Sequence, residues 1–153
     1  MPHQKDIDFS VSSVFQARLT QAFRGDTRSK TEIAKEIGIS KDVFIRAMNA
    51  GLLPSTRTLI KISDYLELSI DYLLGLSDKN TPRKTLDNLS FYERLEQLKT
   101  QANKKYGTIA AEAGLSRSQF STWRQKNYIP SLEVCYQLSL YFHTSLDRLL
   151  ARE

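Results

Sequence analysis

The sequence is poor in the residues from which catalytic and metal sites are built. Cys135 is the single cysteine, so no internal disulfide can form, and its place in an apolar helical pattern predicts a buried structural thiol. His3 and His143 are the only histidines, too few for a metal-ligand cluster at a recognised spacing. No catalytic dyad and no glycine-rich phosphate-binding loop is visible. We therefore expect a non-enzymatic protein that uses no cofactor and no metal, and we infer no small-molecule substrate.

Long apolar runs and a secretory leader are missing as well. No segment approaches the roughly 18 apolar residues that a membrane span requires, and the stretch MPHQKDIDFSVSS has no basic region followed by an apolar core. We therefore expect a cytoplasmic protein with no membrane partner. Lys and Arg number 22 against 17 Asp and Glu, a net charge of +5. This charge is a modest bias toward polyanions such as nucleic acid or an acidic membrane surface.

An internal repeat organises the chain. IAKEIGIS begins at Ile33 and IAAEAGLS begins at Ile109, an offset of 76 residues, and a Pro-Ser pair follows at positions 54 and 130. Residues 15–74 align with residues 91–150 at this offset without a gap. Two copies of one domain are therefore predicted. The expected parts are an N-terminal tail at 1–13, a first domain at 14–75, a linker at 76–89 and a second domain at 90–153.

Each copy reads as five short helices, so the predicted fold is all-α, with two tandem five-helix domains. Apolar residues recur at helical spacing, and no alternation of strand length competes with it. Ser29 with Glu32, and Ser90 with Glu93, fit capping boxes, in which a serine hydroxyl and a glutamate carboxylate satisfy free amides at a helix start. Further helix starts are predicted at Ser40, Ser55, Ser69, Ser116, Ser131 and Ser145, and helix ends at Gly38 and Gly114.

The stretch GLSRSQFSTW, residues 114–123, predicts the second half of a helix-turn-helix unit. A tight turn precedes a helix that begins at Arg117, and such a helix can lie in the DNA major groove. Helical spacing turns Phe120 and Trp123 inward as core residues. The opposite, exposed face carries side chains suited to base reading, since arginine can bond bidentately to guanine and glutamine to adenine at about 1 to 3 kcal/mol per good pair. That face holds Arg117, Ser118, Gln119 and Thr122.

The spacing from Ser116 to Gln119 has a second interpretation. It also fits a capping box in which Gln119 bonds back to the backbone at the helix start and reads no base. Both interpretations stay open at the level of sequence.

At these residues the chain resembles the lambda-repressor-like helix-turn-helix family, of the Cro and repressor type, also called XRE type. The resemblance rests on IAAEAGLSRSQFSTW followed by a Pro-Ser-Leu and SLDRLL, and on IAKEIGISKDVFIR followed by a Pro-Ser and SIDYLLGLSD. It covers residues 15–75 and 91–151. It implies five-helix domains, sequence-specific binding of double-stranded DNA, and transcriptional control, commonly repression, in bacteria or their phages, with a nucleoid-associated location in the cytoplasm.

The resemblance also implies which residues touch DNA. The family's base-contacting positions fall on Arg117, Ser118, Gln119 and Thr122 in the second copy and on Lys41, Asp42, Val43 and Arg46 in the first. Its phosphate-contacting position at the start of the second helix falls on Lys30 and Tyr106, with Thr108 close by. Lys126 and Asn127, just past the recognition helix, are further phosphate candidates.

Two departures from the family pattern bear on these assignments. The family usually carries an acid late in the recognition helix that pairs with a base in the first helix. Here those positions hold Arg124 and Lys99 in the second copy, which predicts that Arg124 turns outward, and Met48 and Phe23 in the first, which predicts an apolar contact. Gly107, early in a helix of the second copy, costs about 1 kcal/mol relative to alanine if helical.

The leading interpretation is a DNA-binding transcriptional regulator whose partner is double-stranded DNA. The alternative is a protein-interaction module, antitoxin-like or antirepressor-like, in which the same helices are docking surfaces; Asp42 and Val43 favour it, because an acid repels phosphate and valine reads little beyond a thymine methyl. The polar segment 76–88, broken by Pro82, could extend to roughly 40 Å at about 3.3 Å per residue. It therefore selects no single arrangement, and a covalent pseudo-dimer and a further homodimer both stay open.

Overall fold

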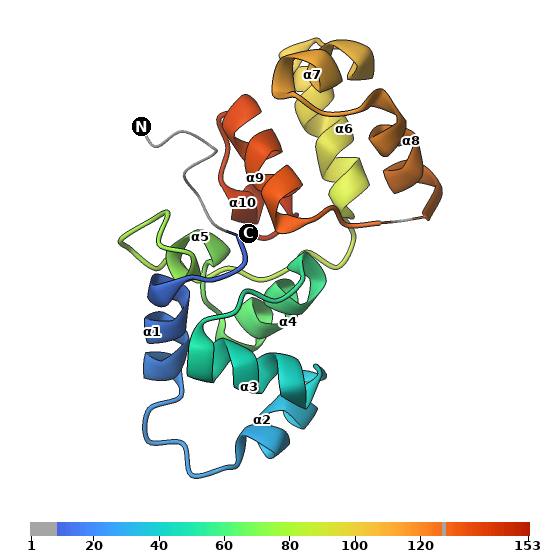
Figure 1. The fold of residues 1–153 in the computed structure, drawn as a ribbon. Helices are drawn as coiled ribbons and strands as arrows, with labels where there is room; N and C mark the ends of the chain where they lie inside the picture. The colour runs from blue at the N-terminus through green and yellow to red at the C-terminus, as the bar shows by residue number, and fades with distance from the viewer. Residues whose placement is uncertain (1–8, 127) are drawn as a thin grey trace. The chain divides into compact units, whose positions relative to one another are not determined.

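The computed structural model describes residues 9–126 and 128–153, which form ten helices and no strand longer than an isolated bridge. The all-α prediction is confirmed for this part of the chain. The chain divides into two compact units, residues 1–84 and 85–153, each of which is described by itself (Figure 1). Among the described residues, no helix has the length and apolar character to cross a membrane.

The five helices of unit 1 enclose a core of large apolar side chains. The helix α1 packs on α3 and α5, and α2 packs on α3 and α4. Phe15, Leu19, Phe44, Leu59 and Ile62 are completely buried between them. The helices are α1 (Ser13–Ala22), α2 (Lys30–Ile37), α3 (Lys41–Ala50), α4 (Thr56–Leu66) and α5 (Ile70–Leu73).

Unit 2 repeats this element order. Its helices are α6 (Phe91–Ala102), α7 (Tyr106–Ala113), α8 (Arg117–Lys126), α9 (Leu132–Tyr141) and α10 (Leu146–Leu149). The bounds of α7, α8 and α10 are those of α2, α3 and α5 moved by 76 residues. Buried positions recur at the same offset, as Phe15 with Phe91 and Phe44 with Phe120. Cys135 is a buried free thiol at the position that Leu59 holds in unit 1, as its apolar surroundings predict.

Local interactions explain where most helices begin and end: side-chain caps set the starts, and left-handed glycines set some of the ends. The serines at 40, 55, 69, 131 and 145 each accept the backbone N–H three residues ahead, as predicted. Ser90 and Glu93 form the complete capping box. At Ser29 only half of the box forms, because the Glu32 carboxylate accepts the Ser29 hydroxyl at 3.2 Å, so the predicted box there is incomplete. Gly38 and Gly114 take the left-handed conformation that ends α2 and α7.

The segment 76–89, predicted as a polar linker, makes hydrogen bonds within each unit. In unit 1 the Ser77 carbonyl accepts the Arg18 guanidinium at 2.9 Å, and the Asn80 side chain accepts the Ser69 N–H at 2.8 Å. In unit 2 the N–H of Leu86 donates to the Ala151 carbonyl at 2.9 Å. Polar backbone and side-chain groups that a free linker would leave to water are therefore bonded within one unit or the other.

Candidate nucleic-acid interface

The same short turn joins α2 to α3 and α7 to α8. In unit 2 Gly114 has a φ of 75° and the Leu115 N–H donates to the Ala110 carbonyl at 2.8 Å, which closes the end of α7. In unit 1 Gly38 has a φ of 87° and the Ile39 N–H bonds Ala34 in the same way at 3.0 Å. Three residues therefore turn the chain between the two helices of each pair.

The inner face of α8 is apolar, as predicted. Trp123 is 2% exposed and Phe120 is 3% exposed, and their ring centroids lie 4.7 Å apart. Trp123 also meets Phe91 of α6 edge to face at 5.7 Å. Aromatic pairs in this geometry add about 0.5 to 1.5 kcal/mol beyond the area they bury. These contacts orient α8 so that its opposite side is turned to solvent.

The outer face of α8 begins with a small hydrogen-bonded group. Arg117, Ser118 and Thr122 are exposed, and Gln119 is half-buried. The Ser116 N–H donates to the side-chain oxygen of Gln119 at 2.8 Å, and the Ser116 and Ser118 hydroxyls lie 2.8 Å apart. In this structure Gln119 therefore caps the helix, as the second interpretation of its spacing predicts. Bidentate reading of adenine needs that oxygen as well as the amide nitrogen, so it requires the cap to open.

The side chain of Arg117 runs along the start of α7. A Cβ added to Gly107 would lie 4.0 Å from both Cδ and Nε of Arg117. Gly107 sits inside α7, where glycine is unfavourable relative to alanine. The 4.0 Å distance is an ordinary van der Waals contact, so a side chain at this position would not by itself displace Arg117, whose side chain lies beside α7.

Tyr106, a predicted phosphate contact, is turned into the unit. Its hydroxyl donates to the Glu96 carboxylate on α6, and its ring lies 5.0 Å from that of Phe120. Burial, and then the bond to Glu96, raise the pKa of Tyr106 far above its usual range. The hydroxyl is therefore engaged within the protein and would have to leave Glu96 to reach a phosphate.

Glu96 resolves the like charges predicted for Lys99 and Arg124. The Tyr106 hydroxyl lowers the pKa of the Glu96 carboxyl, and the positive charges of Lys99 and Arg124 lower it further. Lys99 also lies 4.9 Å from the centre of the Tyr106 ring, a cation–π contact. Arg124 is exposed, as predicted. An acid on α6, one turn before Lys99, therefore lies close enough to both cations to feel their charges, and sequence reasoning did not identify it.

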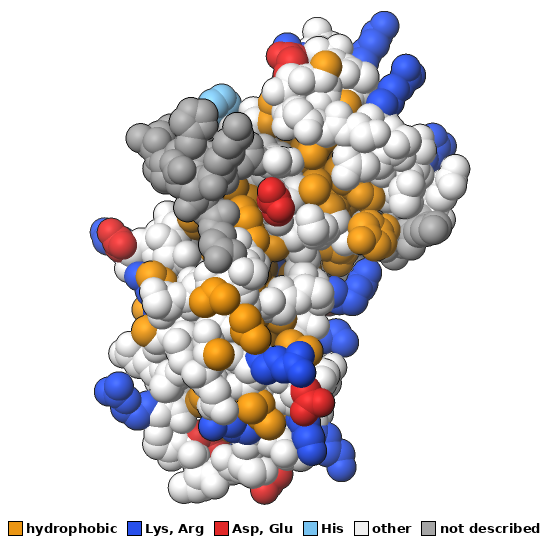
Figure 2. Space-filling view, in the orientation of Figure 1, with side chains coloured by type: hydrophobic (Ala, Val, Ile, Leu, Met, Phe, Trp, Pro, Cys, Tyr) orange, Lys and Arg blue, Asp and Glu red, His pale blue; other side chains and the backbone are white. Residues whose placement is uncertain are grey.

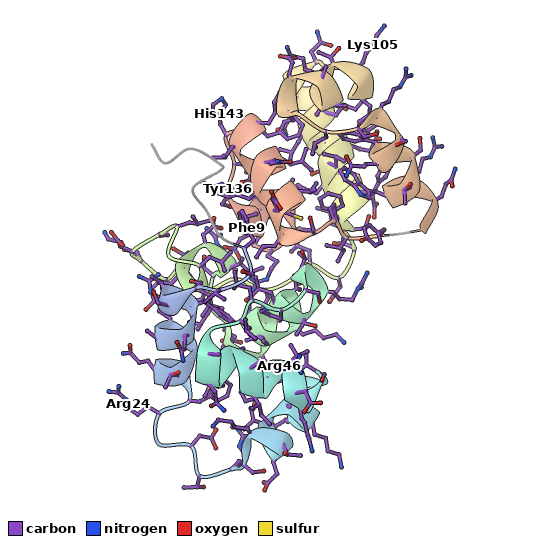
Figure 3. All side chains as sticks on the ribbon, in the orientation of Figure 1. Phe9, Arg24, Arg46, Lys105, Tyr136 and His143 are labelled. Atoms are coloured by element: carbon purple, nitrogen blue, oxygen red, sulfur yellow. The ribbon has the colours of Figure 1, made fainter. Side chains whose placement is uncertain are left out.

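The corresponding face of unit 1 is more highly charged. Lys41, Asp42 and Arg46 are exposed on α3, whereas Val43 is half-buried. Figure 2 shows Lys and Arg side chains standing out over α2 and α3 and over α7 and α8, and Figure 3 marks Arg46 on α3 and Lys105 at the start of α7. The face combines two cations with one acid at the start of the helix.

The predicted Phe23–Met48 contact stays a prediction. The ring of Phe23 packs edge to face on Phe44 at 5.4 Å and stacks on Tyr65 at 6.4 Å. Phe23 is therefore held by aromatic rings of α3 and α4.

The remaining phosphate candidates are placed in part. Lys30 is exposed as the first residue of α2, and Thr108 is exposed in the first turn of α7. Asn127 and the side chain of Lys126 lie outside the described residues.

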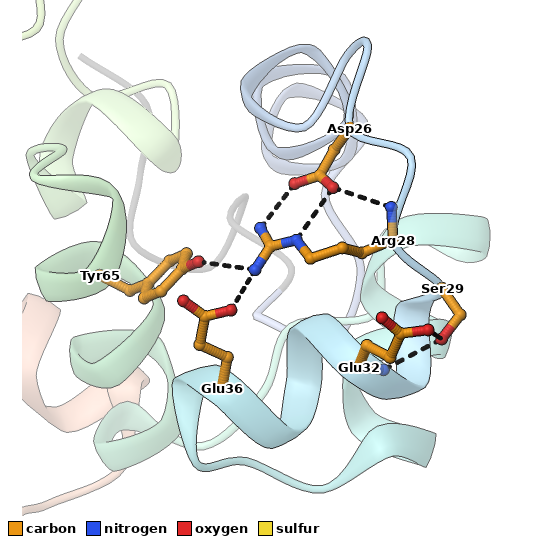
Figure 4. A network of polar contacts seen from close by, with 6 residues as sticks. All are labelled: Asp26, Arg28, Ser29, Glu32, Glu36 and Tyr65. Carbon is orange, nitrogen blue, oxygen red and sulfur yellow. Dashed lines mark hydrogen bonds and ion pairs between the residues drawn. The ribbon is translucent and has the colours of Figure 1, made fainter.

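In each unit a small group of bonded polar side chains, here called the polar clamp, ties α2 or α7 to the rest of the unit. In unit 1 the Arg28 guanidinium bonds Asp26 at 2.6 Å, Tyr65 of α4 at 3.2 Å and also Glu36 at the end of α2 (Figure 4). Its side-chain hydrogen bond lowers the pKa of Asp26 to about 2. Because Glu36 and Tyr65 belong to different helices, the clamp ties α2 to α4.

The clamp recurs in unit 2 at the same offset of 76 residues. Lys104 pairs with Glu112 at 3.2 Å, and the Tyr141 hydroxyl donates to Glu112 at 3.1 Å. Lys104, Glu112 and Tyr141 are equivalent in the repeat to Arg28, Glu36 and Tyr65 of unit 1. Sequence reasoning missed both clamps, although a base, an acid and a tyrosine recurring at one offset were a usable signal.

Comparisons of the whole chain with protein-family models, with curated proteins and with solved structures found no match.

Proposed function

We propose that the chain is a sequence-specific transcriptional regulator of double-stranded DNA, acting as a repressor. In this proposal units 1 and 2 are tandem lambda-repressor-like helix-turn-helix domains, and α3 and α8 enter the major groove. One observation carries it: both units have the same helix pair and three-residue turn at one offset, and each second helix exposes polar side chains at its start. The major groove is wide enough for an α-helix, and the N-terminal part of such a helix meets the base edges.

The side chains divide into two roles under this proposal. Arg117, Ser118 and Thr122 present donors and acceptors to base edges, and Gln119 joins them when its cap opens. Lys30, Thr108 and Lys105 stand near the starts of α2 and α7, where cations, hydroxyls and backbone amides suit phosphate. The clamps at Arg28 and Lys104 support both roles, because they hold α2 and α7 in place against the neighbouring helices.

A titration tests the proposal directly. Purified protein is added to a labelled duplex of random sequence at low salt, and binding is followed by fluorescence polarisation. We expect measurable sequence-independent binding, because phosphate contacts supply nearly all of the non-specific affinity of such proteins. Failure to bind any duplex at low salt would instead support the alternative function.

The alternative is a protein-interaction module, antitoxin-like or antirepressor-like, that uses these helices for docking. The exposed carboxylate of Asp42 in the first turn of α3 favours it, because that charge is repelled by phosphate. Asp42 can also accept from a cytosine amino group, which is why one acid does not overturn the leading proposal.

Unit 2 should dominate sequence recognition. Replacing Arg117 by alanine should lose about 1 to 3 kcal/mol of binding to a selected site and relax preference at the matching base pair. Replacing Lys41 and Arg46 should weaken binding to all sequences similarly, because those side chains suit phosphate attraction better than a base code. Affinities for selected and scrambled duplexes measure both effects.

Gln119 needs a matched control because it also caps α8. Gln119→Ala removes cap and amide together. Gln119→Glu keeps an acceptor for the Ser116 N–H but replaces the amide donor by a negative charge, so an equal loss of affinity for selected and scrambled duplexes reports the charge and a loss confined to the selected duplex reports the amide. If the Lys41, Arg46 variant no longer distinguishes selected from scrambled duplexes while the Arg117 and Gln119 variants still do, then unit 1, not unit 2, dominates sequence recognition.

A further inference from the structure

We propose that the junction between Lys84 and Thr85 limits the spacing of two DNA half-sites that one chain can bind, so that half-site spacing is itself a determinant of specificity. This inference rests on the proposed function. An anchor here is a set of bonds that holds the connecting segment to one unit. The inference concerns how far the chain can reach between the anchor on unit 1 and the anchor on unit 2.

The anchor on unit 1 runs up to the last residue of that unit. The Asn80 side chain accepts the Ser69 N–H at the start of α5, at 2.8 Å. Beyond it, the Lys84 ammonium group pairs with Glu67, just past the end of α4, at 2.8 Å. The chain therefore follows the surface of unit 1 through residue 84.

The anchor on unit 2 begins at the next residue. Thr85 forms an isolated antiparallel bridge with Arg152, and the Leu86 N–H donates to the Ala151 carbonyl at 2.9 Å. Ala151 and Arg152 are buried, and the Arg152 guanidinium is paired with Asp147. The partners of this anchor belong to the interior of unit 2, so we expect it to persist when DNA is bound.

Little chain is left to act as a spacer. Lys84 and Thr85 are consecutive, so no residue lies between the two anchors while the Lys84–Glu67 pair holds. The side chains of that pair are 64% and 59% exposed, and such pairs are weak. If the pair opens, at most the five residues from Asn80 to Thr85 are released, and these span at most about 17 Å at about 3.3 Å each. A free segment 76–88 would reach roughly 40 Å.

Pro82 stiffens even this short span. Proline fixes its own φ, and it disfavours the helical conformation at Thr81 before it. A second recognition helix on a short, stiff tether has a high effective concentration only at spacings that the tether can reach, and nearly none beyond them. Binding two half-sites at a compatible spacing should therefore exceed binding at other spacings by about 10²- to 10⁴-fold, the usual gain from linked sites.

A selection experiment measures the spacing without knowledge of the operator. Wild-type protein selects from a library of fully random duplexes, and the distance between recurring half-sites is tabulated. A lengthened variant carries eight Gly and Ser residues inserted between Lys84 and Thr85, and a second carries them between Thr81 and Pro82. The control carries the same eight residues ahead of Met1. Trp123 fluorescence checks that unit 2 is folded, because Trp123 is buried there and is the only tryptophan in the sequence.

We expect one dominant spacing for the wild type and the control, and a broad distribution for the insertion between Lys84 and Thr85. The insertion between Thr81 and Pro82 should broaden the distribution as well, because the exposed Lys84–Glu67 pair is weak enough to open. Affinity of the lengthened variants for a single half-site should stay within about threefold of wild type, because the insertion lies outside the interface, while the preference among spacings of about 10²- to 10⁴-fold largely disappears. A wild-type distribution that is already flat, or that the insertions leave unchanged, overturns this inference alone. Failure of every protein to enrich any duplex overturns the proposed function, and this inference with it.

Discussion

Raising the salt concentration from about 50 to about 200 mM should weaken binding of duplex DNA by about 10³- to 10⁵-fold, if the chain neutralises about six to ten phosphates. Each neutralised phosphate releases condensed counterions, and the logarithm of the binding constant then falls with the logarithm of salt at a slope near −0.9 per phosphate. Six exposed cations on or beside the two helix pairs are candidates for these contacts: Lys30, Lys41, Arg46, Lys105, Arg117 and Arg124.

Charge-neutral variants connect the slope to particular side chains. Lys41→Gln and Arg46→Gln should each make the slope shallower by about 1 if the side chain contacts a phosphate. Arg148→Gln is the matched control, because Arg148 is also an exposed cation, lies on α10 and belongs to neither helix pair. Equilibrium titrations over a range of salt concentrations give all the slopes. Affinity that does not change with salt would count against a DNA-binding function. If Arg148→Gln made the slope as shallow as Lys41→Gln does, the phosphate contacts would not be confined to the two helix pairs.

The helix ends were predictable from the sequence because the interactions that set them are local. A serine that caps a helix bonds an amide three residues ahead, as Ser40 and Ser131 do, and a left-handed glycine such as Gly114 ends a helix by its own conformation. The buried faces followed from helical spacing, which turned Phe120 and Trp123 inward. In each case the residues involved lie within two helical turns.

The missed features depend on residues far apart in the chain. Tyr106 bonds Glu96 across ten positions, and Arg28 bonds Tyr65 across 37. Neither pairing has a spacing rule, since each depends on how whole helices pack. At Gln119 the spacing allowed two roles, and only the structure shows that the side chain accepts from the Ser116 N–H and so caps the helix.

The largest stability effect is expected from the buried ion pair of unit 2. The side chains of Arg152 and Asp147 are 0% and 3% exposed and are bonded to each other. Removing one partner leaves the other charge buried without its counter-charge, a change that usually costs about 3 to 5 kcal/mol. Asp147→Ala and Arg152→Leu should therefore each lower the free energy of unfolding of unit 2 by about that amount.

Unit 1 supplies the control for this prediction. Asp71 lies at the position equivalent to Asp147, but the position equivalent to Arg152 holds Leu76, which is exposed. Denaturant unfolding followed by Trp123 fluorescence reports on unit 2, so Asp71→Ala should leave that transition unchanged. Replacing Asp147 and Arg152 together by leucine should restore most of the loss, because a buried pair exchanged for apolar side chains is often neutral or stabilising. If each single variant lost less than about 1 kcal/mol, in the range of an exposed pair, the two charges would have to reach water and would not form a buried pair.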